Sequence, residues 1–444
     1  MATINTHYRK LSAGYLFPEI ARRAKAYQEK HVGVSLHKLG IGNTTEALPP
    51  AILEGLHQKI ERLGNVDTYS GYGDEQGDTP LREALSQYYS SFGVEIRSDE
   101  FFVSDGAKAD AANIQSIFGE GNIIAIQDPA YPVYVDSNVV SGRTGSFNSE
   151  TGRYDGFVYL PATSSNNFIP SLPDEKVDLM YLCSPNNPTG AVMTHEQLQA
   201  FVDYARKHKA IIIYDAAYSE FISDPNLPRT IYEIEGAKEC AIEINSFSKF
   251  AGFTGVRLGW TIVPKEIIVE HSDVGELHKI WNRRQVTFFN GASNISQAGG
   301  LSVLTEEGLA ECRSVIAYYM NNAKVIRDGL LKIGLEVTGG DNAPYLWVKA
   351  PQNLTSWQFF DKFLNECQVI VTPGSGFGPA GEGYVRISSF GHSENIEKAM
   401  ELAKNVNDVM QVNVTSQYLL TQALIPTLQL AKNASLIFTS SGVG

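Results

Sequence analysis

Short apolar runs alternate with polar, helix-like segments between Asn122 and Pro264, and this alternation is the strongest constraint on the fold. The runs are NIIAIQ from Asn122, LMYLC from Leu179, AIIIY from Ala210, AIEI from Ala241 and LGWTIV from Leu258. Most are apolar at consecutive positions, as expected for strands covered on both faces. The pattern therefore predicts an α/β fold in which helices cover a mostly parallel sheet.

Clusters of polar residues come directly after these runs. They lie at residues 128–131, 184–190, 215–218 and 246–249. In open α/β sheets ligands bind beyond the carboxyl ends of the strands, so we expect the clusters to meet in one crevice.

A second domain is expected because 444 residues exceed the size of one ordinary hydrophobic core. Residues 299–334 have a helical pattern, and the strand-like segments YLWV and YVRIS follow. We predict a smaller α+β domain built from residues 1–45 and 286–404, beside a large domain at 46–285.

Charge and cysteine content narrow the class of partner and compartment. The formal net charge of -13 opposes attraction to nucleic acid or to anionic membranes. The four cysteines are scattered, without a disulfide framework or zinc-ligand spacing, so we predict no metal site. The start of the chain is too polar for a secretory signal, and no apolar stretch is long enough to span a bilayer. We expect a cytoplasmic protein.

The segment SFSKFAGFTGVRLGW carries the strongest chemical signal. Its Lys249 follows a predicted strand. Ser246 and Ser248 come before this lysine, and Arg257 comes after it. Such an amine can form a Schiff base with a phosphorylated aldehyde, while the hydroxyls and the guanidinium hold the phosphate. The alternative is an ordinary solvated lysine in a loop.

Asp215 ends a strongly apolar run, where an unpaired carboxylate is costly. A protonated pyridine nitrogen is a suitable partner, and Tyr218 is placed to donate to the phenolate oxygen of the same ring. The alternative is an aspartate that caps the next helix.

Three further segments supply candidates for the same crevice. Asn187 in CSPNNPTG lies in a specific turn and can also bond the phenolate oxygen. Ala107 and Lys108 in SDGAK begin a helical stretch, where free backbone amides favour an anion. Tyr131 in DPAYPVY can stack on the ring, although a core or turn tyrosine is the alternative.

Arg386 lies within the apolar run YVRISSF, where a guanidinium needs an anionic partner. A bidentate clamp on a substrate carboxylate satisfies that need. A structural salt bridge is the alternative.

Together, in this order, these residues resemble the fold-type I aminotransferases, which depend on pyridoxal 5'-phosphate (PLP). The resemblance covers residues 1–404. Several motifs are similar in particular to the LL-diaminopimelate aminotransferase family: YLFPEI, IGNTTEALPP, GYGDEQGDTPLRE, DAAYSEFISD, FNGAS and APYLWVK.

The resemblance implies a role for each matching residue. Lys249, Asp215 and Tyr218 are the implied catalytic residues, with Lys249 carrying PLP. The implied cofactor contacts are Tyr72, Ala107, Lys108, Tyr131, Asn187, Ser246, Ser248, Arg257 and Asn290. The implied substrate contacts are Tyr15, Gly42, Glu46, Lys108, Tyr131, Asn187, Asn290 and Arg386. Tyr72 and Asn290 are expected to reach the neighbouring site of a homodimer.

The implied reaction moves the amino group of L-glutamate to L-2,3,4,5-tetrahydrodipicolinate, giving LL-2,6-diaminopimelate and 2-oxoglutarate on the route to lysine. The alternative is an aminotransferase of the same kind that acts on aromatic amino acids, kynurenine or alanine. Two departures from the family pattern bear on substrate preference: Asn43 in place of an aspartate, and the bulky Phe250 after the lysine.

The last part of the chain, residues 405–444, departs from the aminotransferase pattern. It resembles an internal fragment of a short-chain dehydrogenase, but no glycine-rich nucleotide loop precedes it. We expect no oxidoreductase activity from it.

Overall fold

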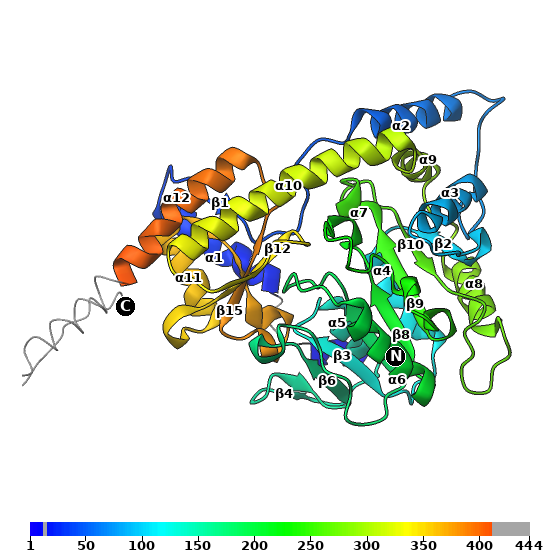
Figure 1. Cartoon of the computed structure of the whole chain (residues 1–444), viewed down its shortest axis with the longest axis horizontal. Coiled ribbons are helices and arrows are strands. Elements are labelled where there is room, and N and C mark those ends of the chain that lie inside the picture. Colours follow the sequence, from blue (N-terminus) through cyan, green and yellow to red (C-terminus); the bar gives the residue numbers. More distant parts are fainter. Residues whose placement is uncertain (12–15, 411–444) are drawn as a thin grey trace, which may run out of the picture.

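The computed structural model describes residues 1–11 and 16–410, and a seven-stranded sheet lies at the centre of the larger of its two parts (Figure 1). The strand order is β2-β10-β9-β8-β7-β3-β6. The strands are β2 (Phe101–Ser104), β3 (Ile124–Asp128), β6 (Phe157–Pro161), β7 (Leu179–Cys183), β8 (Ile211–Asp215), β9 (Ala241–Ser246) and β10 (Gly259–Ile262). All five apolar runs are strands of this sheet, which confirms the predicted α/β fold; β2 and β6 were not predicted.

The strand directions bring the polar segments to one edge. Strands β6, β3, β7, β8 and β9 are parallel, whereas β10 is antiparallel to both β9 and β2. In that register Gly259 pairs with both Ser246 and Ser104. Residues just before β10 therefore lie beside those that follow β9 and β2, so Arg257 reaches the same edge as Lys249.

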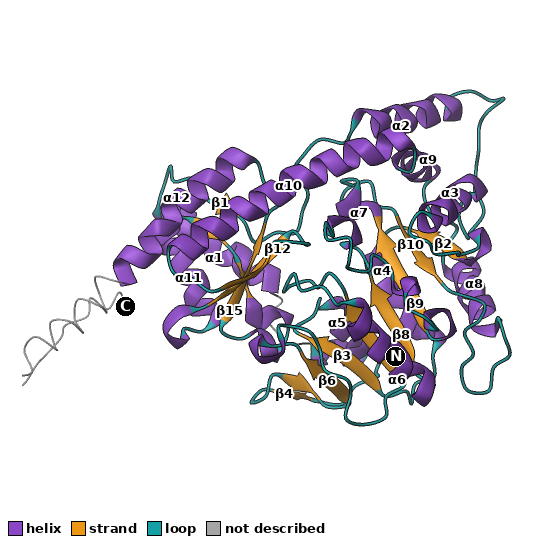
Figure 2. Cartoon of the chain, in the orientation of Figure 1, coloured by secondary structure: helices purple, strands orange, loops and turns teal. Residues whose placement is uncertain are grey.

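Both faces of the sheet are buried under helices (Figure 2). Successive residues of β8 alternate between two hydrophobic clusters: Ile212 and Tyr214 pack into one, and Ile211 and Ile213 into the other. This explains why the strand is apolar at every position. The helices of this part are α2 (Pro50–Leu63), α3 (Thr79–Ser90), α4 (Ala107–Asn113), α5 (Val133–Val140), α6 (His195–His208), α7 (Phe247–Phe250), α8 (Glu276–Phe288) and α9 (Asn294–Val303), and a small hairpin pairs β4 (Phe147–Asn148) with β5 (Arg153–Tyr154).

A smaller, antiparallel sheet has the order β11-β12-β15-β14. The predicted segments YLWV and YVRIS form its two central strands. Its strands are β11 (Val337–Gly339), β12 (Tyr345–Lys349), β14 (Thr372–Pro373) and β15 (Tyr384–Ser388), and a separate pair joins β1 (His37–Lys38) to β13 (Val369–Ile370). A third hydrophobic cluster lies between this sheet and α1 (Leu16–Lys30), α11 (Ser356–Cys367) and α12 (Ser393–Met410).

The helix α10 (Glu306–Lys332) connects the two parts. Its Ile316 packs in a cluster on the larger sheet, and its Ile326 packs in the cluster on the smaller one. The predicted helical stretch at 299–334 is interrupted before α10, where the Thr305 side chain accepts a hydrogen bond from Gly308 N and caps the helix. The domain boundaries at 45/46 and 285/286 stay a prediction.

Two predictions fall on residues outside the described ranges. Tyr15, an expected substrate contact, is one of residues 12–15, and most of the dehydrogenase-like tail lies within 411–444. Within the described ranges, no helix combines the length and the apolar character that a membrane crossing requires.

Ile212 offers a test of the packing that positions β8. It is fully buried, so we expect Ile212→Ala to lower the free energy of unfolding by about 2–5 kcal/mol, through lost burial and a residual cavity. The exposed Ile60 provides the control, and Ile60→Ala should change stability by no more than about 0.5 kcal/mol. Thermal and denaturant unfolding measure both. Equal effects of the two substitutions would contradict the packing described.

Candidate active site

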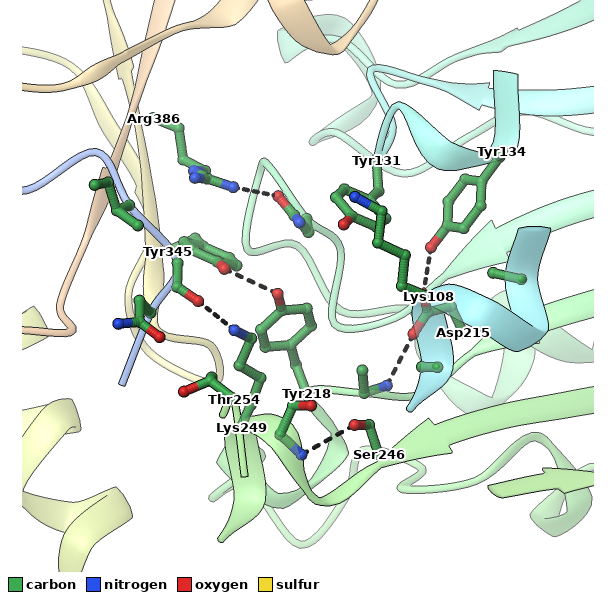
Figure 3. Close-up of a pocket in the computed structure, with 18 of the residues that line it drawn as sticks. Lys108, Tyr131, Tyr134, Asp215, Tyr218, Ser246, Lys249, Thr254, Tyr345 and Arg386 are labelled. Carbon is green, nitrogen blue, oxygen red and sulfur yellow. Dashed lines mark hydrogen bonds between the residues drawn. The ribbon is translucent and has the colours of Figure 1, made fainter. Parts of the chain in front are cut away.

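A cavity of about 290 Å³ lies where the carboxyl edge of the larger sheet faces the smaller sheet. It brings together most of the predicted site residues (Figure 3). Those that line it are Gly42, Ala107, Lys108, Tyr131, Asn187, Asp215, Tyr218, Ser246, Ser248, Lys249, Arg257 and Arg386. The predicted convergence of the polar clusters on one crevice is confirmed.

Lys249 lies in the short helix α7, directly after β9. Its Nζ donates a hydrogen bond to the carbonyl oxygen of Gly42, which belongs to the segment after β1. Burial, together with the positive charges of Arg386 and Arg257, lowers the pKa of Lys249 to about 7. In a large fraction of the molecules the Lys249 amine is therefore neutral at physiological pH, and the neutral amine is the nucleophilic form.

Two hydroxyls and a guanidinium form one end of the cavity. The Ser246 side chain accepts a hydrogen bond from Ser248 N (2.9 Å), and Arg257 Nη1 donates to Ser248 Oγ (3.1 Å). The guanidinium lies so close to Gly106, just before α4, that a Cβ at this glycine would collide with it. Among the described residues no carboxylate forms an ion pair with Arg257. The group therefore suits a phosphate.

Asp215 ends β8 and is only 8% exposed. One carboxylate oxygen accepts from Tyr134 Oη (2.5 Å) and the other from Ala217 N (3.0 Å). Burial raises the pKa of Asp215, and within the described ranges it has no cationic partner. Since both of its partners are neutral donors, the carboxylate can still pair with a cation in the cavity.

Arg386, on β15, is buried. Its Nη1 donates to Asn187 Oδ1 (2.7 Å) and its Nη2 to the carbonyl oxygen of Gly40 (2.7 Å), whereas its Nε is buried without a hydrogen-bond partner. No carboxylate in the described part of the chain pairs with it, so the structural salt bridge that we weighed against a substrate clamp is not formed there.

Aromatic residues form the remaining walls. Tyr131 lines the cavity, with Lys108 Nζ 5.8 Å from the centre of its ring. Tyr218 Oη lies 2.8 Å from Tyr345 Oη, so these two hydroxyls share a hydrogen bond. Both tyrosines are buried.

Three predicted residues lie outside the cavity lining. Glu46 is hydrogen-bonded to His392 Nδ1 (3.0 Å) beside the cavity. Tyr72 and Asn290 are exposed on the surface, and Tyr72 has a relative exposure of 89%. Neither of them lines the cavity of its own chain.

Tyr134 and Tyr345 also line the cavity, although neither was predicted as a site residue. Tyr134 had a weak signal, because it belongs to the same segment DPAYPVY as Tyr131, at the start of α5. Tyr345 had none beyond its place in a predicted strand. Of the two departures from the family pattern, Asn43 lines the cavity, whereas Phe250 is buried against Tyr88 and Phe247.

The charges of the cavity fit a phosphorylated pyridine aldehyde. Such a molecule has an aldehyde for the neutral amine of Lys249, a phosphate for Arg257 and the two serines, and a ring nitrogen for Asp215. None of Lys249, Arg257 and Asp215 forms an ion pair in the described part of the chain, and such a molecule would supply an oppositely charged partner to Arg257 and to Asp215.

Comparison with known proteins agrees with this geometry. Residues 35–402 match the family model of aminotransferase class I and II. A structure of the L,L-diaminopimelate aminotransferase from Chlamydomonas reinhardtii is 49% identical, covers 91% of this chain and 98% of its own, and superposes with a TM-score of 0.86. The aromatic aminotransferase from Pyrococcus horikoshii is 26% identical over 87% of this chain and 99% of its own (TM-score 0.74).

More distant structures share the fold. A mutant aspartate aminotransferase from Thermus thermophilus is 21% identical, with a TM-score of 0.78 over 91% of this chain and 100% of its own. The resemblance seen in the motifs is thereby confirmed: the chain belongs to the class I and II aminotransferases, a PLP-dependent family of fold type I.

Proposed function

We propose that this protein is an LL-diaminopimelate aminotransferase that holds PLP on Lys249. One observation carries the proposal: Lys249, Arg257, Asp215 and Arg386 line one cavity without oppositely charged partners among the described residues. The chain that presents them is 49% identical to a structure of that enzyme. The substrates are L-glutamate and L-2,3,4,5-tetrahydrodipicolinate, and the products are LL-2,6-diaminopimelate and 2-oxoglutarate.

The cofactor is held at three points. Ser246, Ser248, Arg257 and the backbone at Ala107 and Lys108 bind the phosphate. Asp215 pairs with the ring nitrogen, and the hydrogen bond from Tyr134 fixes the orientation of that carboxylate. Tyr218 and Asn187 bond the ring oxygen, and Tyr131 stacks on the ring. When bound, PLP supplies an aldehyde for the amino group and a ring that accepts electrons from the substrate carbon.

Lys249 moves the proton. Once freed from the cofactor, its amine would be an effective base near neutrality, because its pKa is about 7. In the first half-reaction Lys249 Nζ would take the proton from the α carbon of the amino donor and pass it to the former aldehyde carbon of the cofactor, and in the second half-reaction it would move a proton in the reverse direction. Arg257 and Arg386 favour the neutral amine by charge repulsion.

Arg386 binds the α-carboxylate of either substrate. Asn187 and the Gly40 carbonyl hold two of its nitrogens in place, while the buried Nε has no partner until a carboxylate arrives. Gly42 and Lys108 line the cavity beside this position, and Tyr15 completes the set of substrate contacts expected from the family pattern.

A homodimer explains the exposed Tyr72 and Asn290. The loop that carries Tyr72 is tied to α9 by hydrogen bonds from Asn294 Nδ2 to the carbonyl oxygens of Ser70 and Gly71, so the segments that carry the two residues lie side by side. That region also exposes large apolar side chains, among them Tyr69 and Phe288. In the dimer Tyr72 and Asn290 reach the partner's cavity, and Glu46 contacts the distal amino group of diaminopimelate.

Absorption spectroscopy tests the function. We expect the purified protein with PLP to show a visible cofactor band, and LL-diaminopimelate with 2-oxoglutarate to be turned over. Lys249→Ala should lose the protein-linked band and nearly all activity, because the amine that carries the cofactor is removed. The exposed Lys207 provides the control, and Lys207→Ala should behave as wild type. Turnover of aromatic amino acids, kynurenine or alanine without turnover of LL-diaminopimelate would favour the alternative function.

Arg386→Lys tests the carboxylate clamp. A lysine cannot reproduce the planar guanidinium, so we expect the KM for glutamate and for LL-diaminopimelate to rise by roughly tenfold or more, with little change in the cofactor spectrum. Arg206→Lys is the control, since Arg206 forms a surface ion pair with Glu239. Steady-state kinetics measure both variants, and an unchanged KM in Arg386→Lys would argue against the clamp.

The pKa of Lys249 predicts how cofactor uptake depends on pH. Only the unprotonated amine reacts with an aldehyde, and a pKa of about 7 places the loss of its proton near neutrality instead of near 10.5. The rate at which the apoprotein takes up PLP should therefore rise up to about pH 7 and level off above it. Stopped-flow absorption measures this rate, and a continued increase toward pH 10 would contradict the lowered pKa.

A further inference from the structure

Tyr345 has a place in the cavity but no role in the function proposed above. It is the first residue of β12, is 1% exposed and lines the cavity. It comes from the smaller sheet, whereas Tyr218, Asp215 and Lys249 follow strands of the larger one. Figure 3 shows its hydroxyl directed at Tyr218.

The hydroxyl of Tyr345 touches two candidate site residues. Its oxygen lies 2.8 Å from Tyr218 Oη, and the two rings meet edge to face with centroids 5.1 Å apart. It also lies against Gly42, where a Cβ would collide with it. The Gly42 carbonyl accepts the hydrogen bond from Lys249, so the hydroxyl is packed between the backbone that Lys249 contacts and the hydroxyl of Tyr218.

The ring of Tyr345 supports Arg386. The guanidinium carbon lies 4.4 Å from the ring centroid, which is a cation–π geometry. The two residues are on neighbouring strands, where Trp347 pairs with Arg386 and Tyr345 pairs with Ser388. The ring therefore forms a face against which the guanidinium is held while its Nε stays free of partners.

We propose that Tyr345 is a positioning residue, whose hydroxyl orients Tyr218 toward the ring oxygen of the cofactor and whose ring face holds Arg386 for the substrate carboxylate. The inference rests on the proposed function. It gives the smaller sheet a part in both cofactor chemistry and carboxylate recognition.

The donors and acceptors of the Tyr218 and Tyr345 hydroxyls determine how Tyr345 acts on Tyr218. Burial raises the pKa of both phenols, so each keeps its proton at neutral pH. If the Tyr218 hydroxyl donates its hydrogen bond to the cofactor oxygen, it can only accept the hydrogen bond that it shares with Tyr345. A hydroxyl that accepts one hydrogen bond becomes a stronger donor of another. The charged or titratable groups that act on this pair are Arg386, Tyr131 and Cys183, and Lys249 lies across Gly42.

Two variants separate the roles of the hydroxyl and the ring. Tyr345→Phe keeps the ring, so we expect the KM for glutamate and for LL-diaminopimelate to stay within about twofold. The pH midpoint of the colour change of bound PLP should rise by roughly half a unit, because Tyr218 becomes a weaker donor to the cofactor oxygen. Tyr345→Leu also removes the ring, and both KM values should rise about tenfold in addition.

Tyr232→Phe is the matched control. Tyr232 is a buried tyrosine whose hydroxyl accepts from Glu243 N and lies within hydrogen-bonding distance of the Ala241 and Ile262 carbonyl oxygens, away from the cavity lining, so its loss should leave the midpoint and both KM values as in wild type. Circular dichroism and thermal unfolding verify that each variant folds. If Tyr345→Leu does not fold, Tyr345→Phe still decides the role of the hydroxyl.

The outcomes distinguish this inference from the function on which it rests. A wild-type protein without a cofactor band, or without turnover of LL-diaminopimelate, contradicts the proposed function itself. A wild-type enzyme with both properties, whose Tyr345→Phe variant has an unchanged midpoint, overturns the role of the hydroxyl. Unchanged KM values in folded Tyr345→Leu overturn the role of the ring.

Discussion

The alignment of β9, β10 and β2 is the constraint on which the active site depends. Gly259 pairs with Ser246 on one side and with Ser104 on the other, so three chain segments reach the same edge of the sheet. These segments carry Lys249, Arg257 and the start of α4. A shift of one residue in either pairing would turn every side chain of the shifted strand to the opposite face and separate the amine from the guanidinium.

Without ligands, the cavity lowers the stability of the fold, because it removes charged groups from water without pairing them with opposite charges. Lys249 meets part of this cost by giving up its proton near neutrality, and Asp215 meets part of it through Tyr134 and Ala217 N. Arg386 is held by two neutral acceptors and by the aromatic faces of Tyr345 and Phe377. Neutral partners stabilise each group while leaving its charge available, which suits an enzyme whose cofactor and substrates carry the complementary charges.

The two sheets contribute different parts of this arrangement. Strands of the larger sheet lead to Lys249, Asp215 and Tyr218 in the cavity lining, while the smaller sheet supplies Arg386 and Tyr345. The helix α10 packs into cores on both sheets and so couples their positions. In the function proposed here, recognition of the substrate carboxylate by Arg386 would therefore depend on the relative placement of the two sheets.

The sequence alone determined most strands of the larger sheet and many of the residues that gather in the cavity. Consecutive apolar residues predicted five strands, and the polar residues after them predicted Lys249, Asp215, Tyr218 and Arg257, because those patterns are local. Only the tertiary structure decided the contacts between distant residues. Tyr134 reaches Asp215 across 81 positions, Tyr345 reaches Tyr218 across 127 and His392 reaches Glu46 across 346. No local pattern encodes such pairs, since they depend on how the two sheets and their helices pack together.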